Sequence, residues 1–544
     1  MLTNNKNLFI LIAILLLAGF LRFYRLGSLP PSLYSDEAAQ GYNAYSLFNS
    51  GRDEHGRFWP VSLRSFGDWK PPLPTLLMIP AIAVNGLNET SVRFPGAFLG
   101  TATVYLTYLL VKILLINFSG KNKIALLSSF ILTVSPWHIL QSRAAMLVMV
   151  ALFFLMLGTY LFLKGNRRMI YFLFGVFFLT LSVYAYYGLR LVTPLIFIIL
   201  LFLSPRFFYR KTWLLSFLII FSVILPLIIG YLNNPDVIFG RARTISVFYD
   251  QGVNLRLWEL TTQDGLSSDP LITRFFHNRW YLYGKQIVNN FFSHFDGRYL
   301  FLAGDQSQPF KIPGQGILLF IEVVFFPSGL YFLIKKNLSR NYFLLFWLLI
   351  SVLPAALTFM VPSSNRSFNA VFPYAVIISI GIYFLASLLN SKLTSSLITM
   401  LYLINFLYFM NSYFLLLPRD NSSIWNYGWR EAVTYVKKLE KQYDNIIISD
   451  VNGMPYIYFL FYNQYDPAQF QKEAVRSYAA DRFGFEHVES FSKYIFQYEF
   501  DVKLARQNKT ADTLYLVPAD FVPEGEKFGQ SVYYPNGKAA IRIF

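Results

Sequence analysis

The sequence contains no cysteine. This absence excludes disulfide bonds, thiolate zinc sites and cysteine nucleophiles. Charge is also scarce, since 14% of the 544 residues are Asp, Glu, Lys or Arg, whereas a soluble chain carries about 25%. The apolar residues come instead in runs of about twenty, the length of helix that crosses a bilayer. The sequence therefore predicts a helical, multi-pass membrane protein.

Motifs for soluble nucleotides are lacking as well. The chain has no GxxxxGK[ST], no GxGxxG at the start of a helix and no DxD-type motif in a soluble region. Any activated substrate would therefore have to come from elsewhere, such as the membrane. The net charge of +17 does not indicate nucleic acid, because the basic residues form short clusters between apolar runs, which is typical of cytoplasmic loops.

The apolar runs predict eleven membrane spans. Residues 8–21 are followed by Arg22 without a clear cleavage site, so we interpret them as a retained first span and not as a signal peptide. A further stretch, 71–88, is interrupted by prolines and a glycine and leaves a twelfth span open. The eleven runs are 8–21, 93–116, 124–136, 144–163, 169–185, 191–204, 212–231, 315–334, 342–361, 370–389 and 393–417.

Loop charges favour eleven spans with a cytoplasmic N-terminus. In that arrangement the inner loops carry basic residues and no acidic ones, as the positive-inside rule predicts. If 71–88 crossed the membrane, the bias would reverse, so we expect an interfacial helix there. The inner basic residues are Lys6, Lys112, Lys121, Lys123, Lys164, Arg167, Arg168, Arg206, Arg210, Lys211, Lys335, Lys336, Arg340 and Lys392.

The acidic residues fall almost entirely in three regions, 22–91, 232–313 and 418–544, which we place outside the membrane. The last of these reads as a small α/β domain with a parallel or mixed sheet. WREAVTYVKKLEK predicts an amphipathic helix, NIIISD and TLYLVPAD predict buried strands, and IYFLFYN fits either a strand or a helix. We thus expect a membrane domain over 1–417 and an extracytoplasmic domain over 418–544.

The first outer region holds the strongest candidates for chemistry. Asp36 and Glu37 begin a helix-like stretch in which Ser35 could be the N-cap, so a structural role in the first helical turn is one interpretation. The functional interpretation is a general base that takes a proton from an attacking hydroxyl or amine. Asp68 and Lys70 lie just before two prolines that restrict the backbone, which suggests a fixed pair.

A second acidic cluster, Asp53, Glu54 and His55, lies between Gly51 and Gly56, and we interpret it as a solvated turn. Three arginines lie at the predicted outer ends of spans, where the positive-inside rule does not explain them. Arginine suits a phosphate because its planar group can donate two bonds. Each arginine alone could be an anchor or an ion-pair partner, but for the three together we favour a shared anionic ligand, the donor phosphate. Their segments contribute Arg143 with His138, Arg190 with Tyr187, and Arg366 with Asn365.

A metal site has weak support. His277 and His294 lie in the long outer loop, and Asp68 lies in the first, but a metal needs more ligands in a defined geometry. Glu322 lies inside a predicted span, where an acid is a candidate for function or is hydrogen-bonded to a neighbouring helix.

Several segments in order resemble the GT-C membrane glycosyltransferases, most of all the bacterial branch related to protein O-mannosyltransferases and lipid A aminoarabinose transferases. They are SDEAAQGYNAYSL, GDWKPPL, LNETSVRFPGAFLG, SPWHILQSRAA, YAYYGLRL and NRSFNAVFPY, and the resemblance covers roughly residues 20–390. The order of Asp-Glu, Lys-Pro-Pro and Arg-Phe-Pro is its most specific part.

The resemblance implies a polyprenyl-phosphate sugar donor, an active site on the outer face of the cell membrane and inversion at the anomeric carbon. It implies that Asp36 is the base, that Glu37 is its companion and that Lys70 lies near the donor phosphate. The aminoarabinose transferases have a metal-binding Glu directly before that lysine, whereas this chain has Trp69. A divalent metal thus stays open, and the acceptor can be a protein, a lipid or a glycan.

Two other functions compete with this glycosyltransferase. One is a transporter or flippase of a lipid-linked glycan, although transport usually needs polar groups across the whole membrane, and here Glu322 is the deep one. The other is a membrane-anchored binding protein whose activity resides in the C-terminal tail.

Overall fold

The computed structural model describes residues 2–166, 168–204, 210–264, 271, 275–336, 341–389, 391–450, 454–481, 484–522 and 529–544. Arg167, Arg206 and Arg340 of the predicted inner loops lie outside the described residues. The chain divides into two compact units. We call residues 1–21, 100–141 and 148–409 the helical unit, and residues 22–99, 142–147 and 410–544 the mixed unit.

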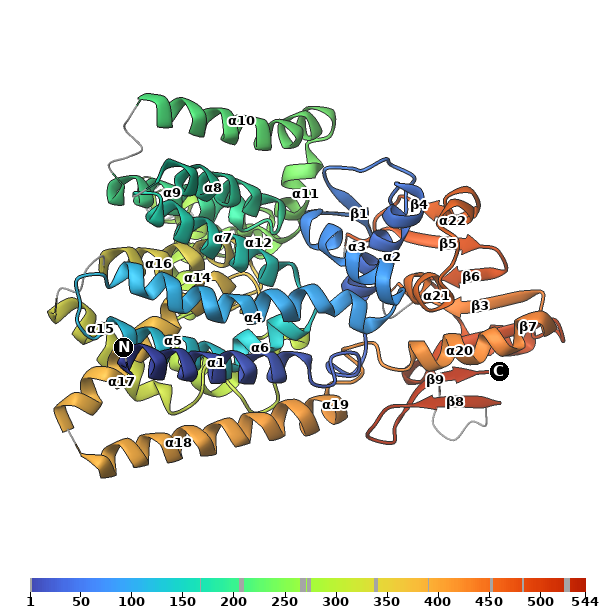
Figure 1. Ribbon diagram of the computed structural model, residues 1–544. Coiled ribbons are helices and arrows are strands. Elements are labelled where there is room, and N and C mark those ends of the chain that lie inside the picture. Colours follow the sequence, from blue (N-terminus) through green and yellow to red (C-terminus); the bar gives the residue numbers. More distant parts are fainter. Residues whose placement is uncertain are drawn as a thin grey trace. The chain divides into compact units, whose positions relative to one another are not determined.

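Some helices of the helical unit continue into the mixed unit, one of them by residues 89–99. The helices of the helical unit are mostly apolar, and many of them run alongside one another (Figure 1). They are α1 (Leu2–Phe23), α4 (Glu89–Leu114), α5 (Lys121–Val134), α6 (Pro136–Arg143), α7 (Leu147–Lys164), α8 (Met169–Leu181), α9 (Leu189–Leu203), α10 (Arg210–Asn233), α11 (Asp236–Ile245), α12 (Gln251–Asp264), α14 (Arg279–Ser293), α15 (Glu322–Lys335), α16 (Asn341–Ala356), α17 (Val371–Leu389) and α18 (Lys392–Asn411).

Among the described residues, 6 helices are long and apolar enough to cross a membrane, or 7 if the bent pair α5 and α6 counts as one span. Shorter apolar helices occupy other predicted spans, at 169–184, 189–203 and 342–356. Two of the long spans, 211–233 and 392–420, have only 11% of their apolar window buried. Such exposed apolar helices are stable only in lipid, so the protein is a multi-pass membrane protein, while the count of eleven spans stays a prediction.

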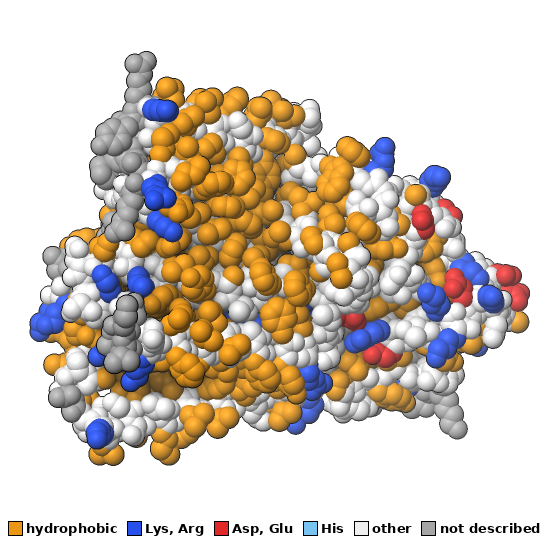
Figure 2. Space-filling view, viewed as in Figure 1, with side chains coloured by type: hydrophobic (Ala, Val, Ile, Leu, Met, Phe, Trp, Pro, Cys, Tyr) orange, Lys and Arg blue, Asp and Glu red, His pale blue; other side chains and the backbone are white. Residues whose placement is uncertain are grey.

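Charge is distributed along the helical unit as expected for spans. Figure 2 shows Lys and Arg side chains at the end of this unit where the N-terminus lies in Figure 1, and apolar side chains over the middle of the helices. Exposed Lys6, Lys123, Lys335, Lys336 and Lys392 belong to the predicted inner loops. Basic residues thus gather at one end of the bundle, and the assignment of that end to the cytoplasm stays a prediction.

The mixed unit combines the first outer region with the C-terminal tail. Its elements are α2 (Ser35–Ser50), β1 (Leu63–Ser65), β2 (Asp68–Lys70), α3 (Leu73–Asn85), α19 (Leu417–Asp420), α20 (Trp429–Leu439), β3 (Asn445–Ser449), α21 (Tyr456–Asn463), α22 (Pro467–Glu473), β4 (Val475–Ser477), β5 (His487–Phe491), β6 (Tyr494–Gln497), α23 (Val502–Gln507), β7 (Thr513–Pro518), β8 (Gln530–Tyr533) and β9 (Ala539–Ile543).

The tail forms a sheet in the order β4-β5-β6-β3-β7-β9-β8. Strand β3 pairs in parallel with β6 and β7, and the other pairs are antiparallel. The predicted α/β tail is therefore confirmed, and its sheet is mixed. Helix α20 buries Trp429, Ala432, Val433 and Val436, the spacing that an amphipathic helix presents to a core.

The ambiguous segment IYFLFYN is helical. It lies in α21, whose residues 456–461 are all buried, and a helix that is apolar all round is a buried one. In Figure 1, α21 lies between α2 and the sheet. One apolar core accordingly includes Tyr42 of α2, Phe459 of α21 and Ile448 of β3. The first outer region and the tail share a single core.

The stretch at 71–88 contains α3, a helix of 13 residues. It packs against α2 in the mixed unit. This packing favours the predicted non-crossing helix, whereas the length does not decide, because α8 also has 13 residues and occupies a predicted span.

Candidate functional site

An ion pair between Asp36 and Lys70 is the centre of the candidate site in the mixed unit. Helix α2 begins at Ser35 after an extended Tyr34, so Tyr34 is the N-cap in place of Ser35, which the sequence offered for that position. Lys70 ends β2 and pairs in register with Leu63 of β1. The Lys70 ammonium contacts the Asp36 carboxylate, and the Asp36 side chain is 45% exposed whereas that of Lys70 is 6% exposed. A solvent-accessible carboxylate is thus held by a buried cation.

Glu37 lies fully buried behind Asp36. Its Oε1 accepts from Arg93 Nε at 3.0 Å and from the Ala145 amide at 2.8 Å. Its Oε2 accepts from Arg93 Nη2 and from the Tyr34 amide, each at 3.0 Å. Both oxygens of this predicted catalytic companion are therefore used to fix the first turn of α2, which sets the direction of Asp36.

Arg93 was not among the predicted site residues. Its Nη1 donates to the carbonyls of Leu26 and Pro30, and its Nη2 donates to that of Ser32 as well as to Glu37. A lone arginine at the start of an apolar span indicates that it pairs with an acid. Nothing in the local pattern, however, identifies Glu37 as that acid.

Asp68 shares the β1–β2 hairpin with Lys70. As alternate residues of one strand, Asp68 and Lys70 point to the same face. Between them, the Trp69 ring has the Arg57 guanidinium 4.6 Å and the Arg64 guanidinium 5.6 Å from its centroid. The departure from the aminoarabinose pattern at Trp69 therefore serves cation–π packing here.

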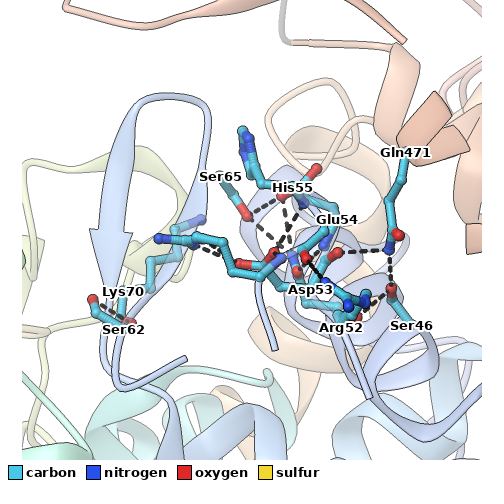
Figure 3. Close-up of polar contacts among 12 residues, drawn as sticks. Ser46, Arg52, Asp53, Glu54, His55, Ser62, Ser65, Lys70 and Gln471 are labelled. Atoms are coloured by element: carbon cyan, nitrogen blue, oxygen red, sulfur yellow. Dashed lines mark hydrogen bonds and ion pairs between the residues drawn. The ribbon is translucent and has the colours of Figure 1, made fainter. Parts of the chain in front are cut away.

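The predicted solvated turn at Asp53, Glu54 and His55 is wrong, because both acids are fully buried. Asp53 forms an ion pair with Arg57, and Glu54 accepts from Asn43 at 3.1 Å and from Ser65 (Figure 3).

Partners from the tail complete this burial. Tyr456 donates to the Glu54 carboxylate at 3.3 Å, Gln471 to the Asp53 carbonyl at 2.9 Å and Arg476 to the Glu54 carbonyl at 2.8 Å. Burial lowers the pKa of His55 to about 2, helped by the nearby arginines. This cluster is a structural joint between the first outer region and the tail.

Arg143 is fully buried in the mixed unit. It donates to the carbonyls of Arg22, Tyr24 and Leu29 at 3.1, 2.7 and 3.2 Å, and to the Tyr413 hydroxyl at 3.2 Å. These contacts favour a structural anchor over a phosphate ligand, because the Arg143 guanidinium binds the carbonyls of the turn after α1.

Arg190 performs a similar task in the helical unit. Its Nη1 donates to the carbonyls of Val237 and Ile238 at 3.1 and 3.0 Å, and its guanidinium lies 5.6 Å from the centroid of the Tyr187 ring. The contacts fasten the first turn of α11. Tyr187 thus contributes its aromatic face to this anchor.

Arg366 differs from these two arginines. Its Nη1 donates to Thr358 Oγ1 at 2.7 Å and to the Met360 carbonyl at 2.8 Å. No other hydrogen bond of this side chain is found within the described ranges, so Nε and Nη2 stay available for an anionic group. Burial, together with the charge of Arg241, lowers the pKa of Arg366. The neighbouring Asn365 has a buried Oδ1 without a partner among the described residues.

His138 and His294 already have hydrogen-bond partners in the interior of the helical unit. His138 is buried, and its Nε2 lies 2.8 Å from Thr103 Oγ1. His294 lies 2.7 Å through Nδ1 from the Asn290 carbonyl and 3.0 Å through Nε2 from the Ser363 amide. His277 lies in a bend before α14. Over the part of the chain that the structure describes, no group of three or more His, Asp or Glu could hold a metal ion.

Glu322 is also occupied. Its Oε2 accepts from the Leu319 amide at 3.0 Å at the start of α15, and its Oε1 accepts from the Tyr402 hydroxyl of α18 at 3.4 Å. The structure therefore shows the hydrogen-bonded contact with a neighbouring helix that was one of the two interpretations.

Two groups of predicted residues result. Asp36, Glu37, Asp68, Lys70 and Arg143 belong to the mixed unit. The helical unit contains His138, Tyr187, Arg190, His277, His294, Asn365 and Arg366.

Comparisons with known proteins agree with this architecture. Residues 12–234 match the family described as "Dolichyl-phosphate-mannose-protein mannosyltransferase". YkcB of Bacillus subtilis (strain 168), named "Putative mannosyltransferase YkcB", is 26% identical over 162 residues, which cover 29% of this chain and 21% of that protein.

Among solved structures, the oligosaccharyltransferase AglB from Archaeoglobus fulgidus matches with a TM-score of 0.50 and 12% identity, over 85% of this chain and 64% of that one. ArnT from Cupriavidus metallidurans matches over 99% of this chain and 98% of that one, with a TM-score of 0.44 and 10% identity. The chain thus spans less than two thirds of AglB and about a fifth of YkcB.

The fold is that of a membrane protein with the GT-C fold and a C-terminal sheet domain. Within it, residues 12–234 match the model of the dolichyl-phosphate-mannose-protein mannosyltransferase family.

Proposed function

We propose that this protein is a glycosyltransferase that moves a sugar from a polyprenyl-phosphate-linked donor to an acceptor at the outer face of the membrane. The family domain and the GT-C fold support this class of reaction. A lipid-linked donor also fits a sequence without a soluble nucleotide motif. The observation that carries the proposal is the half-exposed Asp36 carboxylate held by the buried Lys70.

The proposed reaction is a single displacement with inversion. Asp36 takes the proton of an acceptor hydroxyl or amine, a role that contributes about 10²–10⁴-fold to the rate of an enzyme. The acceptor atom attacks the anomeric carbon, and the bond from that carbon to the phosphate oxygen breaks. The electron pair leaves with the polyprenyl phosphate, whose charge needs nearby cations. Lys70 of the mixed unit is the cation that we assign to it, and the role of Arg366 as a donor-phosphate ligand stays a prediction for the helical unit.

The remaining residues have supporting roles in this proposal. Glu37 orients Asp36 through the first turn of α2, and Asp68 lies on the same strand face as Lys70. The contacts of Arg143 and Arg190 favour anchoring over donor binding. The acceptor can be a protein, a lipid or a glycan, and the sugar can be a hexose, as the family name suggests, or a pentose.

We place the site and the tail outside the cytoplasmic membrane, because the basic ends of the spans indicate the inner face. Accessibility tags at residues 165 and 365 should then report opposite sides of the membrane. The same side for both would contradict the eleven-span arrangement.

A transporter of a lipid-linked glycan is the competing function. It needs polar groups along the crossing, and Glu322, the acid in a predicted span, instead caps α15 and meets Tyr402. These contacts favour the enzyme.

The test uses the full-length protein in proteoliposomes with polyprenyl-phosphate-mannose as the probe donor and membrane extract as the acceptor source. Asp36→Asn should lower sugar transfer by about 100-fold or more while the protein remains folded. Asp420→Asn is the matched control, because Asp420 is a 41% exposed acid that also pairs with a cation, Arg419. Unchanged transfer by Asp36→Asn would refute the base.

A further inference from the structure

A buried carboxylate holds the loop that carries Arg366. Asp305 is 1% exposed. Its Oδ2 accepts from the Ser364 amide at 2.5 Å and from Ser364 Oγ at 2.6 Å, and its Oδ1 accepts from the Ser307 amide at 2.7 Å. Burial raises the pKa of Asp305, while these bonds and the charge of Arg366 oppose the rise. Asp305 is therefore an acceptor for three donors, a set that only a carboxylate can serve with two oxygens.

A buried histidine holds the preceding residue of the same loop. The Ser363 amide is a donor, so His294 Nε2, 3.0 Å away, must accept. The proton of the neutral ring is then on Nδ1, which donates to the Asn290 carbonyl at 2.7 Å. Burial lowers the pKa of His294 to about 4, and the charge of Arg366 adds to the effect. The ring is thus neutral near pH 7 and can act as an acceptor.

Neutral bonds fix the rest of the loop. Trp137 Nε1 donates to the Ser364 carbonyl at 2.9 Å, and Ser367 Oγ donates to the Ser363 carbonyl at 2.7 Å. The Tyr299 hydroxyl lies 3.4 Å from Ser367 Oγ. Both backbone groups of Ser364 are consequently bound by side chains from distant parts of the chain. A loop between two helices does not need this much restraint to connect them.

The restrained loop presents Arg366, whose side chain has hydrogen-bond donors without a partner among the described residues. Arg366 follows Ser364 by two residues, and its own bonds to Thr358 and Met360 use Nη1. Burying a carboxylate costs free energy that is recovered only if its hydrogen bonds are complete. We propose that Asp305 and His294 are positioning residues that aim Arg366 at the phosphate of the donor. This inference rests on the proposed function, because that function supplies the phosphate.

The first experiment measures the loop itself in the full-length protein by hydrogen exchange of the 363–364 amides. Asp305→Asn keeps the size of the side chain but replaces one acceptor oxygen by an NH₂ group. At least one of the three donors that Asp305 binds then loses its acceptor. The substitution should speed exchange at the 363–364 amides by about tenfold or more. His294→Phe should likewise speed exchange of the Ser363 amide. In His294→Gln the side-chain oxygen can still accept a hydrogen bond from that amide, so its exchange should stay as slow as in the wild-type protein. Unchanged exchange in Asp305→Asn and His294→Phe would overturn the inference.

The second experiment measures binding of undecaprenyl phosphate to the same proteins. Asp305→Asn should weaken binding about tenfold in the wild-type background but less than about twofold in Arg366→Ala, because a positioning residue acts through the residue that it aims. Equal losses in both backgrounds would show that Asp305 does not act through Arg366.

The two experiments separate the inference from the function on which it rests. One outcome is faster amide exchange in Asp305→Asn together with unchanged binding of undecaprenyl phosphate in Arg366→Ala. This outcome would refute Arg366 as a phosphate ligand and would thereby overturn the positioning role. Loss of binding in Arg366→Ala with unchanged exchange in Asp305→Asn would leave the proposed function intact and refute the inference alone.

Discussion

Buried acids of the two units are held by different means. In the mixed unit, Glu37 pairs with Arg93 and Asp53 pairs with Arg57. In the helical unit, Asp305 is held by serine and backbone donors, and Arg366 by a hydroxyl and a carbonyl. Removing one partner of a buried ion pair leaves an uncompensated charge, which costs far more than a lost neutral bond. The comparison predicts that mutations of these buried ion pairs affect folding and that mutations around Arg366 affect binding.

The largest effect is expected for Arg93→Met. It leaves the fully buried Glu37 without its cation, which typically costs about 3–5 kcal/mol, a large share of the stability of a folded domain. The thermal unfolding temperature of the protein in detergent should fall sharply. Arg419→Met, which breaks the exposed pair with Asp420, is the control and should cost about 0–1 kcal/mol. Equal stability of the two variants would break the comparison.

Two arginines sharpen the comparison further. Arg143→Met removes four hydrogen bonds from a fully buried site and should cost about 3 kcal/mol or more. Arg366→Met removes two bonds at a partly buried site and should cost about 1 kcal/mol, yet it should weaken the binding of undecaprenyl phosphate. Parallel measurements of unfolding and binding check this. A binding defect without instability in Arg143→Met would restore it as a phosphate ligand.

A smaller effect is expected at the joint between the first outer region and the tail. Tyr456→Phe removes the hydroxyl that donates to the buried Glu54 carboxylate, and a hydrogen bond to a charged group contributes about 1.5–3 kcal/mol. The unfolding temperature should fall by less than in Arg93→Met. Tyr533→Phe, at an exposed tyrosine of β8, should leave it unchanged.

The smallest effect is a dependence on pH. His487 lies 2.6 Å from Asp450 and 3.3 Å from Asp481, and its ring packs on Tyr498. The hydrogen bond and charge of Asp450, supported by Asp481, raise the pKa of His487, although burial opposes this. The pKa of Asp450 is raised by burial in spite of the same bond. Two carboxylates thus face the His487 ring and favour its charged form.

A histidine with a raised pKa stabilises the folded state fully below its ordinary pKa of about 6.5. This stabilisation is lost as the pH rises through the higher value in the folded protein. The unfolding temperature of the full chain should therefore decline from pH 6 to pH 9. His487→Gln should show a flatter profile, and an unchanged profile would refute the assignment.

Local patterns predicted the elements and some of the site. Apolar runs predicted helices, the strands around Ile447 and Leu516 followed from their composition, and two separate motifs placed Asp36 and Lys70 in one region. Local patterns failed where the partner lies far along the chain. Glu54 looked like a solvated acid because Tyr456, 402 residues away, gave no sign of covering it. Asp305 and His294 likewise depend on Ser364 and Ser363, whose backbone amides carry no signal in a sequence.

The core shared by the first outer region and the tail has a consequence for synthesis. A ribosome that adds about 5–20 residues per second needs roughly 20–80 s to travel the 402 residues from Glu54 to Tyr456. During that time the Asp36 segment is already outside the membrane in the proposed arrangement, without the residues that cover it. The newly made protein can therefore become competent only after the tail has been translated, and a chain stopped before the tail would be a target for quality-control proteases.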